Sequence, residues 1–232
     1  DHVVVTGSLE TGQAILSDLA GSVTPATVEL SGCDAVFLLP GADLDLVARA
    51  LVFGMTWNRG ATCIAPHRVL ATLEQLSALE VRLHRAISQV PPGLAGTRRA
   101  EEIRWMARES LSLGARLAAG TLGEGEQIGP AVLAEVTPAM PVASADLMVP
   151  LLNLMPAPNP DVALDIASRS PYALGAAVFG PTAEAAEFAA RIPAGVVVIN
   201  DVIAPTADPR VPFGGRGLSG FGVTRGPEGL LA

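Results

Sequence analysis

The chain has 232 residues, of which 50% are hydrophobic and only 16% are charged. This length and apolar content support a sizeable buried core and exclude a disordered chain. The net charge of −8 arises without any basic cluster, so the chain lacks the electrostatic signature of a nucleic-acid-binding protein. We therefore expect a globular protein that has no nucleic-acid partner.

All 15 basic residues are arginines. Without lysine the chain cannot form a Schiff base, hold pyridoxal phosphate or build a P-loop kinase site. The two cysteines, Cys33 and Cys63, are too few for a disulfide framework, and the three scattered histidines do not give metal-ligand spacing. The sequence therefore predicts a reducing compartment and no metal site.

No apolar run approaches the roughly 20 residues needed to span a bilayer. The N-terminal segment DHVVVTGS also lacks the basic start and the cleavage site of a signal peptide. We expect no membrane partner and a cytoplasmic location.

The first third of the chain alternates apolar runs with helical periodicity. Short buried strands are predicted at 3–6 and 35–39. Apolar residues then recur at helical spacing from Leu44 to Met55, behind a plausible Asp43 cap. The pattern predicts a strand, a strand and a helix in that order.

A strand is predicted at 67–71, and a capping-box pattern, Thr72 with Gln75, opens the helix that follows. A second long helix is predicted from about Arg98. The apolar residues expected on one face of the first helix are Leu73, Leu76, Leu79, Leu83 and Ile87.

The second half of the chain continues the alternation after a glycine-rich stretch at 120–129. Strands are predicted at 131–136, 151–155, 176–179 and 196–200, and helices near 160–169 and 182–191. Such alternation predicts an α/β fold with a largely parallel sheet flanked by helices on both faces.

Three local segments are candidates for chemistry. In V-V-V-T-G-S-L-E-T-G (3–12) a strand runs through Gly7 and Ser8 into a helix that contains Gly12. Backbone amides at a helix N-terminus bind phosphate, and glycine permits close approach of a ligand. By itself the segment is better explained as an ordinary strand-to-helix turn capped by Ser8.

The other two segments contain a lone carboxylate and a lone cysteine. Glu29, in V-E-L-S-G-C (28–33), is a candidate general base, although alone it is better explained as a solvated residue at a strand end. Cys63, in W-N-R-G-A-T-C-I-A-P (57–66), follows a glycine-containing turn that could expose a nucleophile. Most lone cysteines, however, are buried hydrophobic residues.

The order of these segments is more specific than any one of them. T-G-S-x-E-x-G, E-L-x-G and G-x-x-C follow one another, and S-P-Y-A-L-G-A-A-V-F (170–179), V-V-V-I-N-D (196–201) and P-F-G-G-R-G-L-S-G-F-G (212–222) come later. The whole chain resembles the catalytic, C-terminal region of the aldehyde dehydrogenase superfamily. The resemblance implies two domains: residues 1–28 as the end of a dinucleotide-binding domain, and 29–232 as the catalytic domain.

The resemblance also implies the chemistry: NAD(P)-dependent oxidation of a small-molecule aldehyde to a carboxylic acid. Cys63 resembles the nucleophile that forms a thiohemiacetal and then a thioester. Glu29 resembles the base that activates water to hydrolyse the thioester. The Cys63 backbone amide would supply part of the oxyanion hole.

NAD or NADP is the implied cofactor. Gly7 and Ser8 match the turn against the pyrophosphate, and Asn200 lies in a segment that borders the active site. The cofactor-binding residues implied by the resemblance are Gly7, Ser8, Gly12, Leu30, Asp146 and Met148.

The sequence departs from the family pattern at several positions. Where the family has Glu-x-Phe-Gly-Pro beside the nicotinamide ribose, this chain has Asp146, Met148 and Pro150, so a shorter carboxylate and a methionine take those places. Two lysines usual in the family are replaced by Cys33 and Gly217.

Family members carry well over 200 residues before the T-G-S turn and a final strand that helps to join subunits. We therefore expect an excised or truncated catalytic region that binds NAD poorly by itself, and a homo-oligomer in the full-length form.

Alternatives remain open at this point. Cys63 with His67 could form a cofactor-independent thiol esterase, although Pro66 disfavours a helical arrangement of the two. The chain could also be a non-catalytic module that pairs with a separate cofactor-binding chain. A reversible Cys33–Cys63 disulfide is a further hypothesis.

Overall fold

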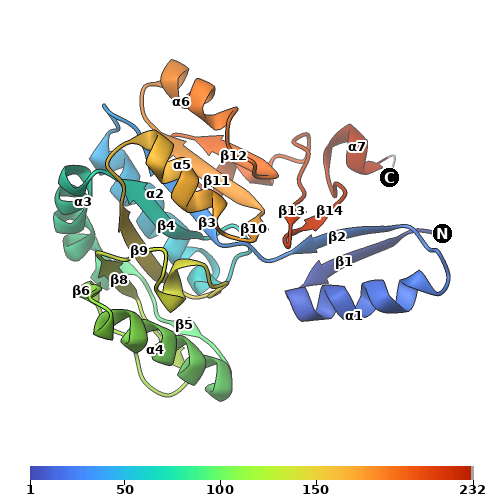
Figure 1. Cartoon of the computed structure of the whole chain (residues 1–232), viewed down its shortest axis with the longest axis horizontal. Coiled ribbons are helices and arrows are strands. Elements are labelled where there is room, and N and C mark those ends of the chain that lie inside the picture. Colours follow the sequence, from blue (N-terminus) through green and yellow to red (C-terminus); the bar gives the residue numbers. More distant parts are fainter. Residues whose placement is uncertain (231–232) are drawn as a thin grey trace.

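A seven-stranded sheet forms the centre of the computed structural model, which describes residues 1–230 (Figure 1). Every neighbouring pair in it is parallel except the pair at one edge, β8 with β6. The prediction of an α/β fold with a largely parallel sheet is therefore confirmed. In spatial order the strands are β12 (Val196–Ile199), β11 (Gly175–Phe179), β3 (Asp34–Leu38), β4 (Pro66–Ala71), β9 (Leu151–Pro156), β8 (Ala131–Ala134) and β6 (Arg116–Gly120).

Helices cover both faces of this sheet. On one face, α2 (Leu44–Thr56) and α3 (Leu73–Ala86) share a core with Val36, Leu38 and Val69. On the other, α4 (Thr97–Ser112), α5 (Pro160–Ser168) and α6 (Thr182–Ala189) pack with Phe37, Leu70 and Leu133. Since successive strand residues point to opposite faces, Val36 and Phe37 belong to different cores, as strands buried on both sides require.

The caps that begin α2 and α3 form as the sequence predicts. The Asp43 side chain accepts hydrogen bonds from the N–H groups of Asp45 and Leu46, at 2.9 and 3.1 Å. Thr72 and Gln75 form a complete capping box, which satisfies two backbone donors at the start of α3.

The predicted apolar face of α3 is wrong at one residue. Leu76, Leu79, Leu83 and Ile87 are buried, but the Leu73 side chain is 63% exposed. Leu73 is the first residue of the helix. Helical period alone does not tell how far the core extends along a helix, so the buried stripe starts one turn later than predicted.

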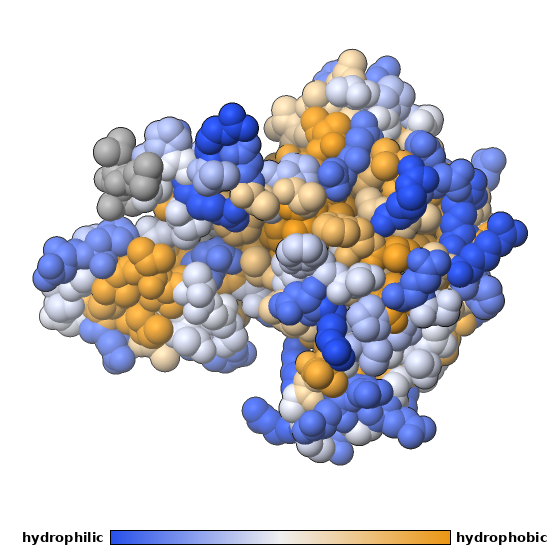
Figure 2. Space-filling view, turned by 180° about the vertical axis from the view of Figure 1, so that it is seen from behind, coloured by the Kyte–Doolittle hydropathy of each residue, from blue (hydrophilic) through white to orange (hydrophobic). Residues whose placement is uncertain are grey.

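A second, smaller unit extends from the main body and contains the N-terminus (Figure 1). It is a three-stranded sheet, in which β2 (Ala26–Leu30) lies between β1 (Val3–Gly7) and β14 (Gly220–Phe221), with α1 (Leu9–Ala20) packed against it. Figure 2 shows a hydrophobic patch on this unit. The predicted domain boundary between residues 28 and 29 falls inside β2, and the division into two domains stays a prediction. Residues 231–232 of the predicted catalytic domain lie outside the described part of the chain.

The remaining elements are short. The sequence pattern does not predict them, because strands and helices of only two to five residues show no detectable period. They are β5 (Gly93–Leu94), β7 (Gln127–Ile128), β10 (Tyr172–Ala173), β13 (Arg216–Gly217), α7 (Gly226–Leu230) and the 3₁₀ helices Trp57–Gly60, Ile87–Gln89, Pro141–Ala143 and Ala204–Ala207.

Within residues 1–230, no helix has the length and apolar character required to cross a bilayer. In the same residues, no group of three or more His, Cys, Asp or Glu side chains is arranged to hold a metal ion.

Leu79 provides a test of the α2–α3 core. Its side chain is fully buried, whereas Val81 on the same helix is 53% exposed. We expect Leu79→Ala to lower the free energy of unfolding by about 2–5 kcal/mol, because it leaves a cavity. Val81→Ala should change it by less than about 0.5 kcal/mol. Urea denaturation followed by circular dichroism measures both, and equal losses would contradict the assigned packing.

Candidate active site

An open groove runs between the small unit and the main body, where Figure 2 shows the surface notched. Its volume of about 1300 Å³ exceeds the roughly 300–1,000 Å³ of ordinary small-ligand pockets. The groove can therefore hold an extended ligand together with a second, smaller one. Among its lining residues are Gly7, Ser8, Glu10, Glu29, Leu30, Cys63, Arg98, Arg99, Asp146, Met148 and Tyr172.

Cys63 reaches the groove from a strained turn. The preceding residues Asn58, Arg59 and Gly60 all have positive φ angles, of 48°, 55° and 76°. A Cβ atom at Gly60 would lie only 2.5 Å from the Pro150 backbone nitrogen, so glycine is required there. The Asn58 side chain closes the turn by donating to the Ala61 carbonyl at 2.6 Å. The result is a partly buried thiol at the groove wall.

Glu29 lies near the end of β2, in the other sheet. It pairs with Thr6 of β1 on one side and with Gly220 of β14 on the other. The next residue is also held, because Leu30 donates to the Ser219 carbonyl at 3.0 Å. Backbone pairing on both sides therefore fixes the position of the carboxylate.

The thiol and the carboxylate line the same groove. Burial raises the pKa of Cys63, and the negative charge of Glu29 and hydrogen bonding to its side chain add to this shift, which brings the pKa to about 12. Because a thiol donates and a carboxylate accepts, Glu29 is the neighbouring group that can take the Cys63 proton. The pair can move a proton from sulfur to carboxylate when the sulfur forms a new bond.

A second carboxyl group lies in the same groove. Asp146 Oδ1 is buried and has no hydrogen-bond partner in the described chain. Burial raises the pKa of this carboxyl, and the Ser31 side chain opposes the shift by hydrogen bonding to it. A buried acceptor without a donor fits the hydroxyl groups of a ribose, so Asp146 suits a nucleotide ligand despite being shorter than glutamate.

Gly7 and Ser8, which the resemblance matches to the pyrophosphate turn, line the groove at the start of α1. The Ser8 side chain accepts from the Thr11 N–H at 3.3 Å, so it caps the helix as well. The capping function and exposure to the groove are compatible, because backbone N–H groups at a helix N-terminus can still bind an anion.

Two residues named from the resemblance lie away from the groove. Gly12 is buried against Leu30, and a Cβ there would lie 2.7 Å from a Leu30 methyl carbon, so it acts through packing. Asn200 instead joins β12 to the end of β11, donating to the Gly180 carbonyl and accepting from the Gly180 N–H, both at 3.0 Å.

His67 and Cys33, the alternative partners considered for Cys63, also lie outside the groove. His67 is 1% exposed within β4 and does not line the groove, and burial lowers its pKa to about 4. Cys33 is 2% exposed, its thiol lies 3.9 Å from the Ala143 carbonyl, and burial raises its pKa to about 11. The structure therefore does not bring His67 to Cys63, and both thiols are free.

The groove contains charged and aromatic residues that the sequence does not single out. Arg99 donates to the Asp146 carbonyl and pairs with Glu102 at 2.8 Å, while Tyr172 lines the wall nearby. The adjacent pair Arg98–Arg99 is a visible signal, since it opens a helix. Nothing in the local sequence places it beside Asp146.

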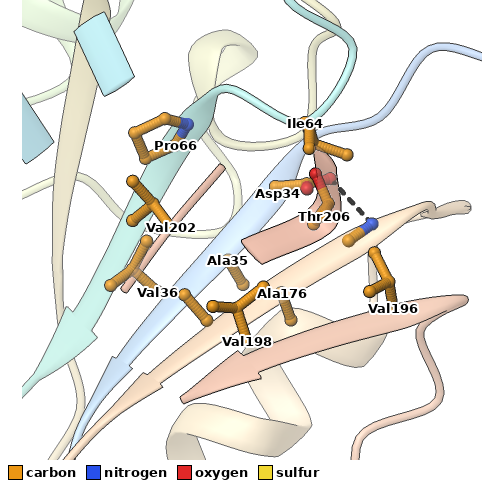
Figure 3. A pocket seen from close by; sticks show the side chains of 12 residues that line it. Asp34, Ala35, Val36, Ile64, Pro66, Ala176, Val196, Val198, Val202 and Thr206 are labelled. Carbon is orange, nitrogen blue, oxygen red and sulfur yellow. Dashed lines mark hydrogen bonds between the residues drawn. The ribbon is translucent and has the colours of Figure 1, made fainter. Parts of the chain in front are cut away.

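A small cavity lies beside Ile64, the residue that follows Cys63 (Figure 3). Asp34 and Ile64 line it, and Asp34 accepts from the Gly175 N–H at 3.1 Å. Burial raises the pKa of Asp34 to about 7. A Cβ at Gly175 would lie 2.2 Å from the Asp34 carboxylate, so only glycine allows this contact. Asp34 thus fixes β3 to β11 directly beneath the Cys63 turn.

Comparison with known proteins identifies the class. The family model described as the aldehyde dehydrogenase family matches residues 1–232. The chain is 32% identical to a succinate semialdehyde dehydrogenase [NAD(P)+] of Escherichia coli, covering 95% of this chain and 50% of that protein. It is 29% identical to a 4,4'-diapolycopene aldehyde oxidase of Methylomonas, covering 100% and 46%. The chain belongs to the aldehyde dehydrogenase family.

Solved structures agree with this assignment. An NADP-dependent glyceraldehyde-3-phosphate dehydrogenase of Bacillus halodurans, complexed with NADP, superposes with a TM-score of 0.92 at 28% identity, covering 100% of this chain and 50% of that one. An aldehyde dehydrogenase of Mycobacterium tuberculosis, complexed with NAD+, gives 0.91 at 27% identity, covering 99% and 50%. The chain spans about half the length of the relatives it matches.

The pH dependence of Cys63 labelling tests whether Glu29 raises the pKa of the Cys63 thiol. In a Cys33→Ala background, the iodoacetamide rate should rise about tenfold per pH unit from pH 7 to beyond 10, because the thiolate reacts and its pKa is about 12. Glu29→Gln removes a negative charge, so the pKa should fall and labelling at pH 8 should be several-fold faster.

Glu10→Gln is the control, since Glu10 lines the groove but does not perturb Cys63. Mass spectrometry of the Cys63 peptide gives the rates. A plateau near pH 9 in the parent chain, or equal acceleration by both substitutions, would contradict the geometry.

Proposed function

We propose that this chain is the catalytic region of an NAD(P)-dependent aldehyde dehydrogenase that uses Cys63 as nucleophile and Glu29 as general base. The observation that carries the proposal is that the Cys63 thiol and the Glu29 carboxylate, which raises the pKa of that thiol, share a groove with Asp146, whose buried Oδ1 has no hydrogen-bond partner in the described chain. This oxidation requires a nucleophile, a base and a group that holds the cofactor by accepting hydrogen bonds, all in one groove.

Cys63 begins the reaction by attacking the aldehyde carbonyl carbon. As the carbon–sulfur bond forms, the thiol proton passes to Glu29. The Cys63 backbone N–H donates to the carbonyl oxygen, which becomes an oxyanion. The product is a thiohemiacetal anion on Cys63, with the proton on Glu29.

When bound, NAD or NADP would supply the hydride acceptor that the conversion of this adduct to a thioester requires. Gly7 and Ser8 would hold the pyrophosphate, Asp146 the ribose, and Leu30 and Met148 the nicotinamide end. Glu29, after losing its proton to solvent, takes a proton from water as the water oxygen attacks the thioester. The carboxylic acid leaves and the Cys63 thiolate regains a proton.

The relatives' names do not agree on one substrate, so we propose only the class, an aldehyde. A cytoplasmic location and a homo-oligomeric full-length form stay predictions. The alternative of a non-catalytic module that pairs with a separate cofactor-binding chain predicts no thiol-dependent turnover of any kind.

Hydrolysis of p-nitrophenyl acetate tests the second half of the mechanism, because acylation and hydrolysis need no cofactor. We expect the chain to hydrolyse this ester, and Cys63→Ala to abolish the reaction. Glu29→Gln should slow deacylation by about 10²–10⁴-fold, and one equivalent of nitrophenol should appear in a burst before the slow phase.

His67→Ala and Cys33→Ala are the matched controls, since both side chains are buried outside the groove. Each should leave the rate nearly unchanged once circular dichroism has shown the variant to be folded, because neither side chain lines the groove. Loss of activity in His67→Ala would favour the Cys63–His67 esterase, and activity that survives Cys63→Ala would overturn the proposal.

We also propose that the chain alone holds the cofactor weakly. The groove offers one ribose carboxyl and one helix start, and it is open to solvent along the small unit. Calorimetric titration with NAD should therefore show no saturation at micromolar concentrations. A micromolar Kd, about −8 kcal/mol, would contradict this part while leaving the roles of Cys63 and Glu29 intact.

A further inference from the structure

A second cavity lies on the α5 face of the main sheet, and Tyr172 lines both this cavity and the groove. It has a volume of about 60 Å³, enough for several water molecules or one small organic ion. Its walls include the apolar residues Phe37, Leu164, Ile192 and Ala194, and the hydroxyl-bearing residues are Ser168, Ser170 and Tyr172. Arg68 also lines it.

Arg68 is 4% exposed. Its Nε and Nη2 atoms donate to the Cys33 carbonyl at 2.9 and 2.7 Å, and Nη1 donates to the Ala167 carbonyl at 3.4 Å. A guanidinium has five N–H donors, so these bonds leave two without an assigned acceptor. The long Nη1 bond runs to a residue of the cavity wall, which places this end of Arg68 at the cavity.

The charge of Arg68 has no direct counterion within the described chain. None of the ion pairs in residues 1–230 involves it, and no Asp or Glu lines the cavity. Asp34 is near enough to interact electrostatically, but it lies in the other cavity and bonds to Gly175 (Figure 3). Burying a cation with only carbonyl partners is costly, and an anion beside it would remove that cost.

The charge and the walls of the cavity restrict the kind of anion that can bind there. One cation with apolar walls suits an anion that has a single negative charge and a short hydrocarbon tail. A carboxylate group fits because it accepts the two parallel N–H donors that a guanidinium presents. The volume excludes a nucleotide or a long-chain acid. We propose that this cavity binds a short aliphatic monocarboxylate of two or three carbons, with its carboxylate on Arg68 and its tail toward Ile192 and Ala194.

Thermal unfolding of the chain at constant ionic strength tests the proposal, with sodium propionate replacing sodium chloride. We expect a saturable rise in Tm of roughly 3 °C at millimolar propionate. Arg68→Met should abolish the rise. Ala194→Leu keeps Arg68 but fills the cavity, so it should also abolish the rise and remains informative if Arg68→Met does not fold.

Arg169→Met is the matched control, because Arg169 is exposed and paired with Asp165 outside the cavity. It should keep the full response, and so should Cys63→Ala, which separates this cavity from the groove. Equal stabilisation by sulfate, or a propionate response that survives Ala194→Leu, would overturn the proposal.

Discussion

The placement of Glu29 and Cys63 in one groove depends on a glycine-rich segment that joins the small unit to the main body. Glu29 belongs to the three-stranded sheet and Cys63 follows a helix of the main body. Residues 212–222 cross between them: β13 pairs with β10 of the main body, and β14 pairs with β2. A Cβ at Gly220 would lie 1.9 Å from the Val28 carbonyl, so this pairing needs glycine there. The segment therefore acts as the connection that brings the Glu29 carboxylate and the Cys63 thiol to one groove.

Burial determines the resting protonation of the site. It raises the pKa of Cys63, Asp34 and Asp146, because a poorly solvated environment disfavours each charged form. A thiol with a pKa of about 12 is almost wholly protonated near neutral pH. The Cys63 sulfur can therefore form a new bond near neutral pH only if its proton leaves at the same time. Glu29, which lines the same groove, is a carboxylate that can accept that proton.

Long periodic elements could be predicted from the sequence, whereas contacts between distant segments could not. The alternation of buried strands with capped helices gives β3, α2 and α3 closely, since Asp43 and Thr72 are local signals. The two-residue strands β10, β13 and β14 have no period, although they hold the site together. Arg99 beside Asp146 likewise depends on tertiary packing. Motif order was informative because Cys63, Glu29, Ser8 and Asp146 line one groove, yet it could not distinguish Gly12, which packs behind that groove.

The segment that carries Glu29 continues into the polar interior of the main body. After β2 the chain passes Ser31, whose carbonyl accepts from Ser219, and reaches Cys33, whose carbonyl accepts two bonds from Arg68. Asp34 then bonds to β11. Each of these attachments lies within five residues of Glu29, and they anchor its segment at successive points from the groove to the Arg68 cavity. A shift of the Arg68 guanidinium would act first on the Cys33 carbonyl, so the buried charge belongs to the same structural support that positions Glu29.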